Sequence, residues 1–429
     1  MEILMENVRS FSGRFSIPLR RLTFLVGENS TGKSTFLAMF AHTSQLGFPT
    51  LRPLFSVPPF DLGTYDSIAT SNKRGQAARA NSFSVGYSNS HNGTESRVLA
   101  TYSSYRGQPQ LSRFKVNKDS SEVSLEVDAA TLRGRLRINS PTIHSDYELD
   151  LKQMRSIDAD VSVTSIIQNF IFDVGFRSET PTEKRPNVEE IMNLLYEARG
   201  ARSPVFALAP VRTKPRRTYD EISDKFMPEG DHIPVLLARA WQSKEDTNRL
   251  TLMHGLNEFG RESSLFRNIR VKRLGAKPSD PFQILVAAGG PAANLPDVGY
   301  GVSQALPVVV QSLLAERERT LLLQQPEVHL HPRGQAALGS FFARLVAKER
   351  KAFVIETHSD YLLDRIRLEI ASGNLSPSDV MILFFEKKVA QTKVSRILID
   401  DGGNIVDAPR SYRKFFLDEE LTLMSRANK

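Results

Sequence analysis

The chain has 429 residues, of which 40% are hydrophobic and 24% charged, which is enough for a large core and more than one lobe. No run approaches the roughly 18 apolar residues of a membrane span, and no signal-peptide pattern opens the sequence. The absence of cysteine excludes a disulfide framework and is typical of a cytoplasmic protein, which we expect. The net charge of +8 favours a polyanionic partner.

A glycine-rich loop follows the first strongly apolar segment. Residues 22–26 predict a strand, residues 36–40 predict the beginning of a helix, and residues 27–35 between them read GENSTGKST. This is the complete G-x-x-x-x-G-K-[ST] phosphate loop in strand–loop–helix context. Backbone N–H groups of such a loop and the positive end of the helix bind phosphate oxygens. The loop therefore predicts a nucleoside triphosphate with Mg²⁺ as the ligand.

Three side chains of this loop have predicted contacts of their own. Lys33 places its charge on the β- and γ-phosphates, Ser34 offers its hydroxyl to Mg²⁺, and Thr35 lies near the α-phosphate. The other nucleotide-binding positions that we predict in the loop are Gly27, Asn29, Ser30, Thr31 and Gly32.

The next part of the chain predicts a different structure. Residues 47–155 predict a mostly antiparallel sheet, because segments such as 82–87 and 98–103 alternate between apolar and polar residues, and turn residues gather at 89–93. Residues 159–200 and 231–273 predict helices from the spacing of their apolar residues. Residues 205–209 between them predict a strand that returns the chain to the core.

Polar residues end two further predicted strands. The apolar residues 320–323 are followed by QQPEVHLHP at 324–332, and the apolar residues 352–355 are followed by ETHSD at 356–360. In proteins with a phosphate loop, the carboxyl ends of neighbouring strands carry the partner of Mg²⁺ and the residue that orients the attacking water. These two segments therefore predict the remainder of the catalytic site.

A fourth block, DVGYGVSQ at 297–304, opens a predicted helix at 305–314 and offers another anion site. Together the four blocks resemble the ABC-type ATPases, in the branch of the SMC and RecF repair proteins and the overcoming-lysogenization-defect (OLD) family. They are most similar to AAA/ABC-like ATPases of bacterial anti-phage defence. The resemblance implies an α/β fold: a P-loop ABC-type ATPase head with a mixed parallel core sheet, an antiparallel β-lobe and a helical lobe. It divides the chain into the ATPase core at 1–46, the β-lobe at 47–155, the helical lobe and linker at 156–290, and the core again at 291–429.

The resemblance also implies roles for single residues. Gln324 falls where the Walker B acid holds Mg²⁺ through water, and Gln325 falls where these ATPases keep the catalytic glutamate. His358 falls at the switch histidine that senses the γ-phosphate, and Arg9 reaches the nucleotide from the first strands. ATP and Mg²⁺ are the implied ligands.

The signature motif of this superfamily touches the ATP of a second subunit. By resemblance, Gly301, Ser303 and Gln304 belong to that motif here, with Ser303 as the best candidate, while His329 and His331 fall in the D-loop. The implied assembly is a homodimer or a higher homo-oligomer that closes through its ATP sites.

The Walker B pair departs from the family pattern, because relatives commonly keep a glutamate at its first position. An amide accepts no proton and brings no net charge. Since general-base help supplies roughly 10²–10⁴-fold in rate, we expect intact ATP binding and slow hydrolysis. Three explanations are open: Gln324 replaces a glutamate in order to trap the ATP state, the protein is naturally slow and acts as a clamp, or Glu327 or Glu356 substitutes for the missing acid. Glu327 lies too far along the loop to replace Gln324 directly, which ranks the third explanation last.

Lysine and arginine gather in three segments that we predict as loops, at 73–79, 212–217 and 267–273. Phosphate contacts need such cations, so DNA is a candidate partner, although no base-reading motif accompanies them. A solvated face or a contact between subunits explains them equally well.

The function that the resemblance implies is an ATPase that dimerises around ATP. It would act as a sensor and scaffold in anti-phage defence and control a separate effector protein. We find no Toprim nuclease motif after the ATPase segments. Two alternatives are open: a RecF/SMC-like DNA-repair ATPase, and a non-hydrolysing scaffold gated by ATP.

Overall fold

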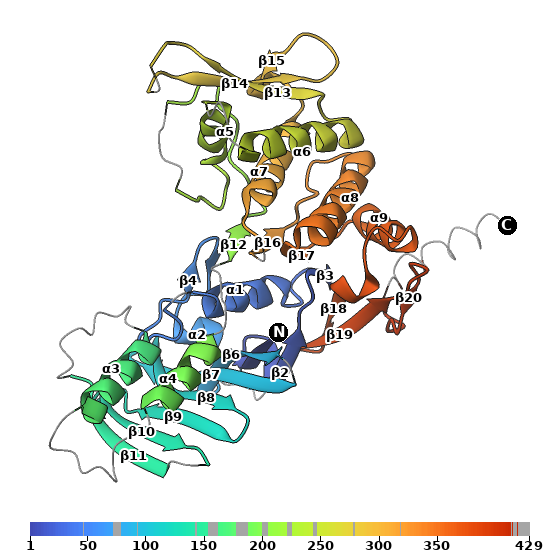
Figure 1. The fold of residues 1–429 in the computed structure, drawn as a ribbon. Helices are drawn as coiled ribbons and strands as arrows, with labels where there is room; N and C mark the ends of the chain where they lie inside the picture. The colour runs from blue at the N-terminus through green and yellow to red at the C-terminus, as the bar shows by residue number, and fades with distance from the viewer. Residues whose placement is uncertain are drawn as a thin grey trace. The chain divides into compact units, whose positions relative to one another are not determined.

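The computed structural model describes residues 1–45, 47–71, 79–91, 93–141, 144–152, 162–176, 188–199, 205–220, 225–242, 247–277, 279–317, 319–412, 414 and 418. The chain folds into two compact units (Figure 1). The first unit comprises Met1–Leu19, Ser34–Val205 and Lys387–Thr392. The second unit comprises Arg20–Lys33, Phe206–Glu386 and Lys393–Lys429.

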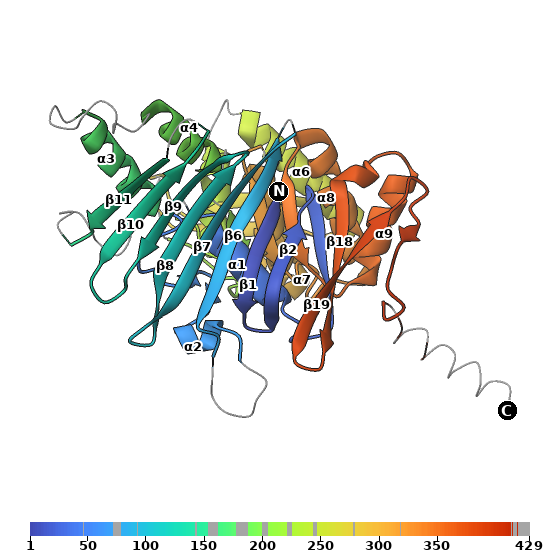
Figure 2. The ribbon, with the colours of Figure 1, turned by 90° about the horizontal axis from the view of Figure 1, so that it is seen from below.

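An eight-stranded sheet forms the centre of the first unit, and Figure 2 shows its strands side by side. The order is β11-β10-β9-β8-β7-β6-β1-β2, and every neighbouring pair is antiparallel. Its strands are β1 (Glu2–Val8), β2 (Phe11–Pro18), β6 (Ser82–His91), β7 (Thr94–Tyr105), β8 (Gln108–Lys118), β9 (Ser121–Val127), β10 (Arg133–Asn139) and β11 (His144–Asp150). The alternation that predicts the sheet is visible in β7, where Val98, Ala100 and Tyr102 are buried. The predicted antiparallel sheet is confirmed.

Helices of the first unit are α1 (Lys33–Thr43), α2 (Tyr65–Ile68), α3 (Val163–Phe176) and α4 (Val188–Arg199), and a short hairpin pairs β4 (Ser56–Val57) with β5 (Phe60–Asp61). Helix α4 packs on β7 and β8. It buries Ile191 and Leu195, which recur at helical spacing. The helices predicted within residues 159–200 are therefore confirmed where the chain is described.

A seven-stranded sheet forms the centre of the second unit, in the order β12-β16-β17-β3-β18-β19-β20. These strands are β3 (Leu22–Gly27), β12 (Phe206–Leu208), β16 (Thr320–Gln324), β17 (Ala352–Glu356), β18 (Val380–Lys388), β19 (Gln391–Ile399) and β20 (Ile405–Val406). The first five in the order are parallel, and β19 pairs with β20 antiparallel. The α/β class with a mixed, mainly parallel core sheet is confirmed.

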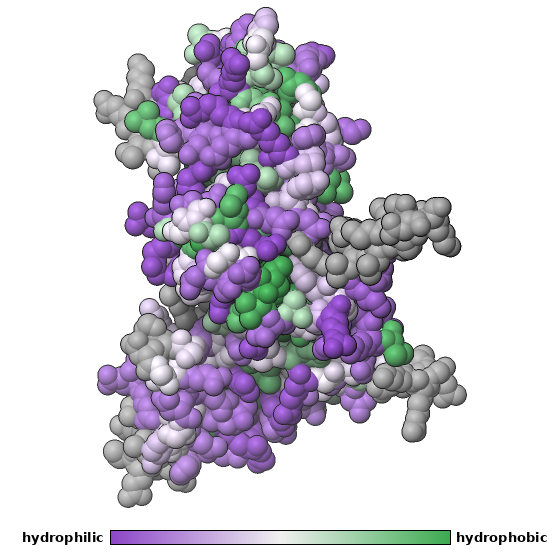
Figure 3. Space-filling view, turned by 90° about the vertical axis from the view of Figure 1, so that its right-hand side faces the viewer, coloured by the Kyte–Doolittle hydropathy of each residue, from purple (hydrophilic) through white to green (hydrophobic). Residues whose placement is uncertain are grey.

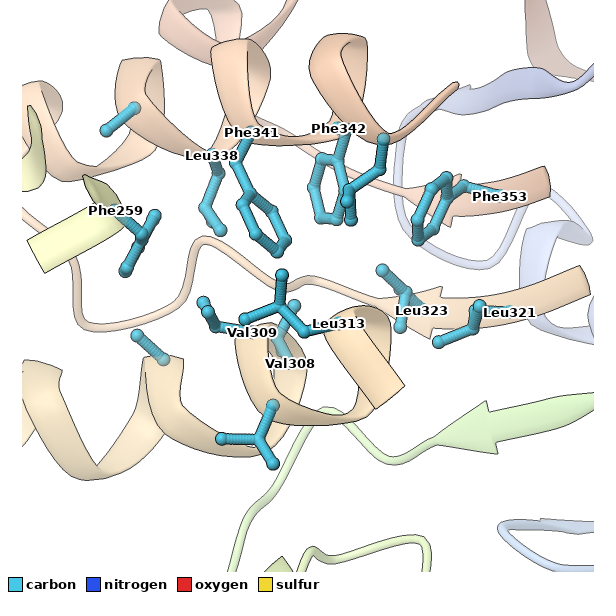
Figure 4. Close-up of a cluster of buried hydrophobic side chains, with 14 of the residues drawn as sticks. Phe259, Val308, Val309, Leu313, Leu321, Leu323, Leu338, Phe341, Phe342 and Phe353 are labelled. Atoms are coloured by element: carbon cyan, nitrogen blue, oxygen red, sulfur yellow. The ribbon is translucent and has the colours of Figure 1, made fainter. Parts of the chain in front are cut away.

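Helices of the second unit bury a large apolar cluster against this sheet (Figure 4). They are α5 (Ile233–Gln242), α6 (Thr247–Ser263), α7 (Tyr300–Leu314), α8 (Pro332–Glu349) and α9 (Asp360–Ala371), with 3-10 turns at Leu295–Asp297 and Pro377–Asp379. In the close-up, Phe341 and Phe342 of α8 lie between Phe259 of α6 and Phe353 of β17. Burial of such aromatic side chains supplies much of the stability that holds the strands in place.

A small sheet stands where the sequence predicts only helices and a loop. Strands β13 (Asn268–Arg273), β14 (Phe282–Ala287) and β15 (Ala293–Asn294) pair antiparallel. The prediction of helix for residues 231–273 is therefore wrong after α6, and the basic segment 267–273 is mostly a strand. The physical reason is that Ile269 and Val271 alternate with Arg270 and Lys272, which is the period of a strand with one buried face.

The surface is mostly hydrophilic in the view of Figure 3, where hydrophobic residues form small patches. Within the described part of the chain, no helix is both long and apolar enough to cross a membrane.

Candidate functional site

The phosphate loop begins where β3 ends, and its backbone can be formed only by glycine at Gly27. This residue has φ +134°, and a Cβ there would lie 2.1 Å from the carbonyl oxygen of Phe385 in β18. Ser30 and Gly32 also have positive φ, of 62° and 108°. Positive φ values within one short loop turn its backbone N–H groups toward one concave surface, which is the property that binds phosphate. The loop thus has the local geometry that its sequence predicts.

Lys33 is folded back into this loop. Its Nζ donates to the carbonyl oxygens of Gly27 at 2.8 Å and Glu28 at 2.7 Å, and only 3% of the residue is exposed. The Thr31 hydroxyl donates to the same Glu28 oxygen at 2.8 Å. Burial lowers the pKa of Lys33, while Glu356 and Glu28 act in the opposite direction.

In the first unit, Ser34 and Thr35 occupy the first turn of α1. Ser34 is exposed, as a Mg²⁺ ligand should be. The Nη1 of Arg9 lies 3.4 Å from the Thr35 hydroxyl, and its other nitrogens donate to the carbonyl oxygens of Leu62 and Ser67 at 3.3 and 3.1 Å. The structure therefore brings Arg9 to the same helix turn as Thr35.

The two polar strand ends of the second unit lie next to each other. Strands β16 and β17 are parallel and pair Gln324 with Glu356. The Nε2 of Gln324 donates to Oε2 of Glu356 at 3.4 Å, and Oε1 of Glu356 lies 4.0 Å from the Nζ of Lys33. Because β3 is parallel to β17, the phosphate loop leaves the same edge of the sheet.

An open cavity of about 440 Å³ lies beside these strand ends, lined by Glu28, Asn29, Gln325 and His358. Gln325 has φ 44°, and its N–H donates to the carbonyl oxygen of Glu356 at 2.8 Å. Burial lowers the pKa of His358 and the charge of Lys33 adds to that effect, so the imidazole is neutral at pH 7. Gln325 and His358 thus line the same cavity, and their role at the γ-phosphate stays a prediction.

Glu327 binds the loop that carries His358. Its Oε1 accepts the Thr357 hydroxyl at 2.7 Å and the N–H of His358 at 2.8 Å. Its other oxygen has no hydrogen-bond partner among the described residues. This carboxylate is therefore engaged in holding the second strand end.

Arg212 lies buried beneath the same turn, at 3% exposure. Its Nη2 donates to the carbonyl oxygens of Gln324 and Gln325, both at 3.4 Å. Burial lowers the pKa of Arg212 to about 10, opposed by the charge of Glu327. The side chain is still charged at pH 7, and Glu327 is the acid that offsets its charge.

The structure does not present Ser303 for contact with a second subunit. Helix α7 begins at Tyr300, so Ser303 and Gln304 lie within its first turns and are 6% and 2% exposed. The Ser303 hydroxyl donates to the carbonyl oxygen of Tyr300 at 2.8 Å. Helix packing covers both side chains in the single chain, and their contact with a second subunit stays a prediction.

The exposed beginning of α7 is Gly299 and Tyr300, followed by half-buried Gly301. The ring of Tyr300 packs edge-on against His329, with centroids 5.0 Å apart. His331 has a structural task, since its Nδ1 accepts the N–H of Arg333 and caps α8.

Residues 173–363 match the family model described as an AAA ATPase domain. That segment contains both polar strand ends and lies outside the phosphate loop. Together with the phosphate loop, this match identifies the chain as an ATPase.

Three solved structures are similar to this chain at low identity. The SMC head bound to the C-winged helix domain of ScpA is 12% identical, covers 93% of this chain and 97% of its own, and has a TM-score of 0.44. The SMC head domain from Thermotoga maritima is 10% identical, covers 93% of this chain and 98% of its own, and has a TM-score of 0.43. The Pyrococcus furiosus SMC head with an extended coiled coil, bound to the C-terminal domain of ScpA, is 10% identical, covers 100% of this chain and 99% of its own, and has a TM-score of 0.41. No curated protein matches this chain.

The oxygen donors near the loop fit Mg²⁺ held partly through water. In the second unit they are the Gln324 amide and the Glu356 carboxylate, and Mg²⁺ in ATPase sites keeps several waters and takes few protein ligands. Among the described residues, no group of three or more histidines and acids could hold a metal by itself. The site is thus completed by phosphate oxygens, as in other phosphate-loop proteins.

Sequence reasoning missed two features of this site. It placed Arg212 in an exposed basic loop, although the apolar run before it, FALAPV at 206–211, signals a chain that enters the core. It also gave Glu327 no structural role. The contact of Glu327 with Thr357 joins residues 30 positions apart, and no local pattern reveals it.

Proposed function

We propose that two copies of this chain close around ATP and that nucleotide state sets their assembly. The observation that carries this proposal is the buried Lys33 at the joint edge of β3, β16 and β17. A loop of this geometry binds the phosphates of a nucleoside triphosphate, and Lys33 supplies the charge for the β- and γ-phosphates.

The need for a second copy comes from the open side of the cavity. Glu28, Asn29 and His358 in its wall are exposed to solvent. Phosphoryl transfer to water needs donors around the γ-phosphate, because charge stabilisation supplies most of the catalysis. The exposed N–H groups at Gly299 and Tyr300 of a second copy offer such donors at the positive end of a 15-residue helix.

The chemistry that we propose is in-line attack of water on the γ-phosphate, which breaks the bond between the γ-phosphorus and the β–γ bridging oxygen, releases ADP and passes the water proton to a phosphate oxygen. Lys33 binds and orients the phosphates, neutral His358 donates one N–H to the γ-phosphate, and Gln325 orients the water by hydrogen bonding. When bound, Mg²⁺ would neutralise charge on the β- and γ-phosphate oxygens. Since Gln325 accepts no proton, turnover is slow and the closed state is long-lived.

The biological role that we propose is a sensor and scaffold in anti-phage defence, which holds or releases a separate effector protein according to its ATP state. The support for this role is the resemblance of the phosphate loop, the 297–304 block and the two strand-end motifs to ATPases of such systems. Binding of a phage product would bias the open–closed equilibrium only through different affinities for the two states.

A RecF/SMC-like role on DNA is the second candidate, and β13 favours it. Arg267, Arg270 and Lys272 are exposed and form no salt bridge among the described residues. Arg270 and Lys272 point to the solvent face of the strand, opposite Leu285 and Gln283 of β14. Such a face contacts phosphates without reading sequence.

The deciding experiment measures ATP hydrolysis together with assembly size, by light scattering with and without ATP, for the parent chain and Lys33→Ala. We expect ATP-dependent dimers and slow hydrolysis in the parent and neither in the variant. A parent that stays monomeric with ATP bound contradicts the clamp. Stimulation by duplex DNA that weakens with salt and with Arg270→Ala/Lys272→Ala would favour the DNA role.

A further inference from the structure

The end of β16 lacks the carboxylate that a Mg²⁺·ATP site needs. In phosphate-loop ATPases an acid at a strand end near the loop faces the Mg²⁺ site. The segment that resembles this motif here stands at the end of β16, which β17 separates from the loop strand β3, and it carries the uncharged amides Gln324 and Gln325. Mg²⁺ with a triphosphate prefers at least one carboxylate nearby.

Glu356 is the acid that faces the phosphate-loop lysine. It ends β17, is 6% exposed, and lies in register with Gln324 on the neighbouring strand. In a parallel pair, residues in register point to the same face of the sheet. Its two oxygens point in two useful directions: Oε2 toward the Gln324 amide at 3.4 Å, and Oε1 toward the Lys33 ammonium at 4.0 Å.

The other buried acid of this turn is engaged elsewhere. Oε1 of Glu327 accepts from Thr357 and His358 at 2.7 and 2.8 Å, and its charge is opposed by Arg212. Glu327 therefore positions the His358 loop, and its hydrogen bonds to that loop are shorter than either Glu356 contact above. Glu327 thus holds the loop, whereas Glu356 faces Lys33.

The energetics also favour a function for Glu356. A carboxylate at 6% exposure has lost most of its hydration. A cation carrying two charges attracts such a carboxylate more strongly than a lysine at the same distance does. Gln324 can donate its amide to one carboxylate oxygen and leave the other directed at the loop.

We propose that Glu356 supplies the acid of the Mg²⁺·ATP site, so that the acid stands at the end of β17 and no longer at the end of β16. Gln324 positions this carboxylate through its amide. The inference rests on the proposed ATP site. If it holds, the amide at Gln324 does not by itself impair the binding of Mg²⁺. It leaves the absence of a base at Gln325 unchanged.

The test compares Glu356→Gln, Gln324→Glu and the swapped Gln324→Glu/Glu356→Gln with the parent, and Glu316→Gln as a control on an acid that is 75% exposed. The first readout is Mn²⁺ affinity in the presence of a non-hydrolysable ATP analogue, by electron paramagnetic resonance. The second is nucleotide affinity with Mg²⁺ and with EDTA, and the third is hydrolysis.

We expect Glu356→Gln to weaken Mn²⁺ binding by roughly 10- to 100-fold, the range for residues that act on a metal through water or a ligand. Its nucleotide affinity in EDTA stays within about threefold of the parent or becomes tighter, because a buried negative charge is lost, and this shows that the loop is folded. The swapped variant regains Mn²⁺ binding, and Glu316→Gln behaves as the parent.

Unchanged Mn²⁺ affinity in Glu356→Gln would overturn the assignment of Glu356. Failure of the proposed function looks different, because the parent itself would then bind no nucleotide with Mg²⁺ or with EDTA.

Discussion

The ends of β16 and β17 lie side by side in one sheet and differ in charge. The end of β16, which resembles a Walker B motif, carries two amides, whereas the end of β17 carries a buried carboxylate two residues before His358. The amide Gln325 lines the open cavity, and the acid Glu356 faces Lys33. The comparison teaches that the charge of such a site belongs to the pair of strand ends and not to one motif.

The largest expected effect comes from restoring a base to β16. Gln325→Glu places a carboxylate in the cavity beside His358, at the position that the resemblance assigns to a catalytic glutamate. We expect hydrolysis to rise roughly 10²-fold or more, since general-base help contributes roughly 10²–10⁴-fold. Phosphate release under saturating ATP measures this rate.

Gln325→Asn is the matched control, because it keeps the amide and shortens its reach. An unchanged rate in Gln325→Glu would show that the β16 end lacks more than a base, and the division of roles between the two strand ends would fail.

Removing the cation that Glu356 faces should affect binding. Lys33→Ala deletes the charge donor to the phosphates and leaves Glu356 buried opposite an empty space. We expect ATP affinity to fall about 100-fold, because hydrogen bonds between charged groups contribute about 1.5–3 kcal/mol. Calorimetric titration with ATP measures it, and Lys348→Ala on the exposed face of α8 serves as control.

The third effect concerns the support beneath both strand ends. Arg212→Met leaves the Glu327 carboxylate buried without its opposing charge. Breaking a buried pair costs about 3–5 kcal/mol, and we expect the lower end because Nε and Nη1 of Arg212 have no partner among the described residues. Urea unfolding measures the loss of stability.

The double variant Arg212→Met/Glu327→Gln removes the second charge as well and keeps an acceptor for Thr357 and His358. It should regain most of the stability of the parent. If the double variant is no more stable than Arg212→Met, the two side chains are not coupled and Arg212 acts through the carbonyl oxygens of the turn.

Local sequence was sufficient for the parts of this site that depend on local geometry. The phosphate loop, its strand and its helix follow from nine residues whose backbone requirements are specific, such as the positive φ of Gly27 and Gly32. The two polar strand ends also follow, because an apolar run followed by polar residues marks where a buried strand leaves the core.

Long-range register could not be predicted in the same way. That Glu356 stands opposite Gln324 depends on how β17 pairs with β16, across 32 residues and the helix α8. The burial of Ser303 depends likewise on where α7 begins and what packs on it. Strand β13 was missed because six residues with two charged positions also fit a loop.

The smallest expected effect is on the acid sensitivity of the fold, and it comes from His42, which belongs to the first unit. His42 lies at the end of α1, 3% exposed, stacked on Phe55 at 4.0 Å, and neither ring nitrogen has a partner among the described residues. Burial lowers its pKa to about 3, whereas an unfolded histidine titrates near 6.5. The unfolded state therefore binds the extra proton between these two pKa values. The free energy of unfolding is thus largest above pH 6.5 and falls by about 1.4 kcal/mol per pH unit below it.

His42→Leu should remove this slope. Between pH 6 and pH 5, the free energy of urea unfolding should fall by about 1 kcal/mol more in the parent than in the variant. His254→Leu, at an exposed histidine of α6, should keep the parental slope. Parallel slopes for the parent and His42→Leu would instead assign the acid sensitivity to groups other than His42.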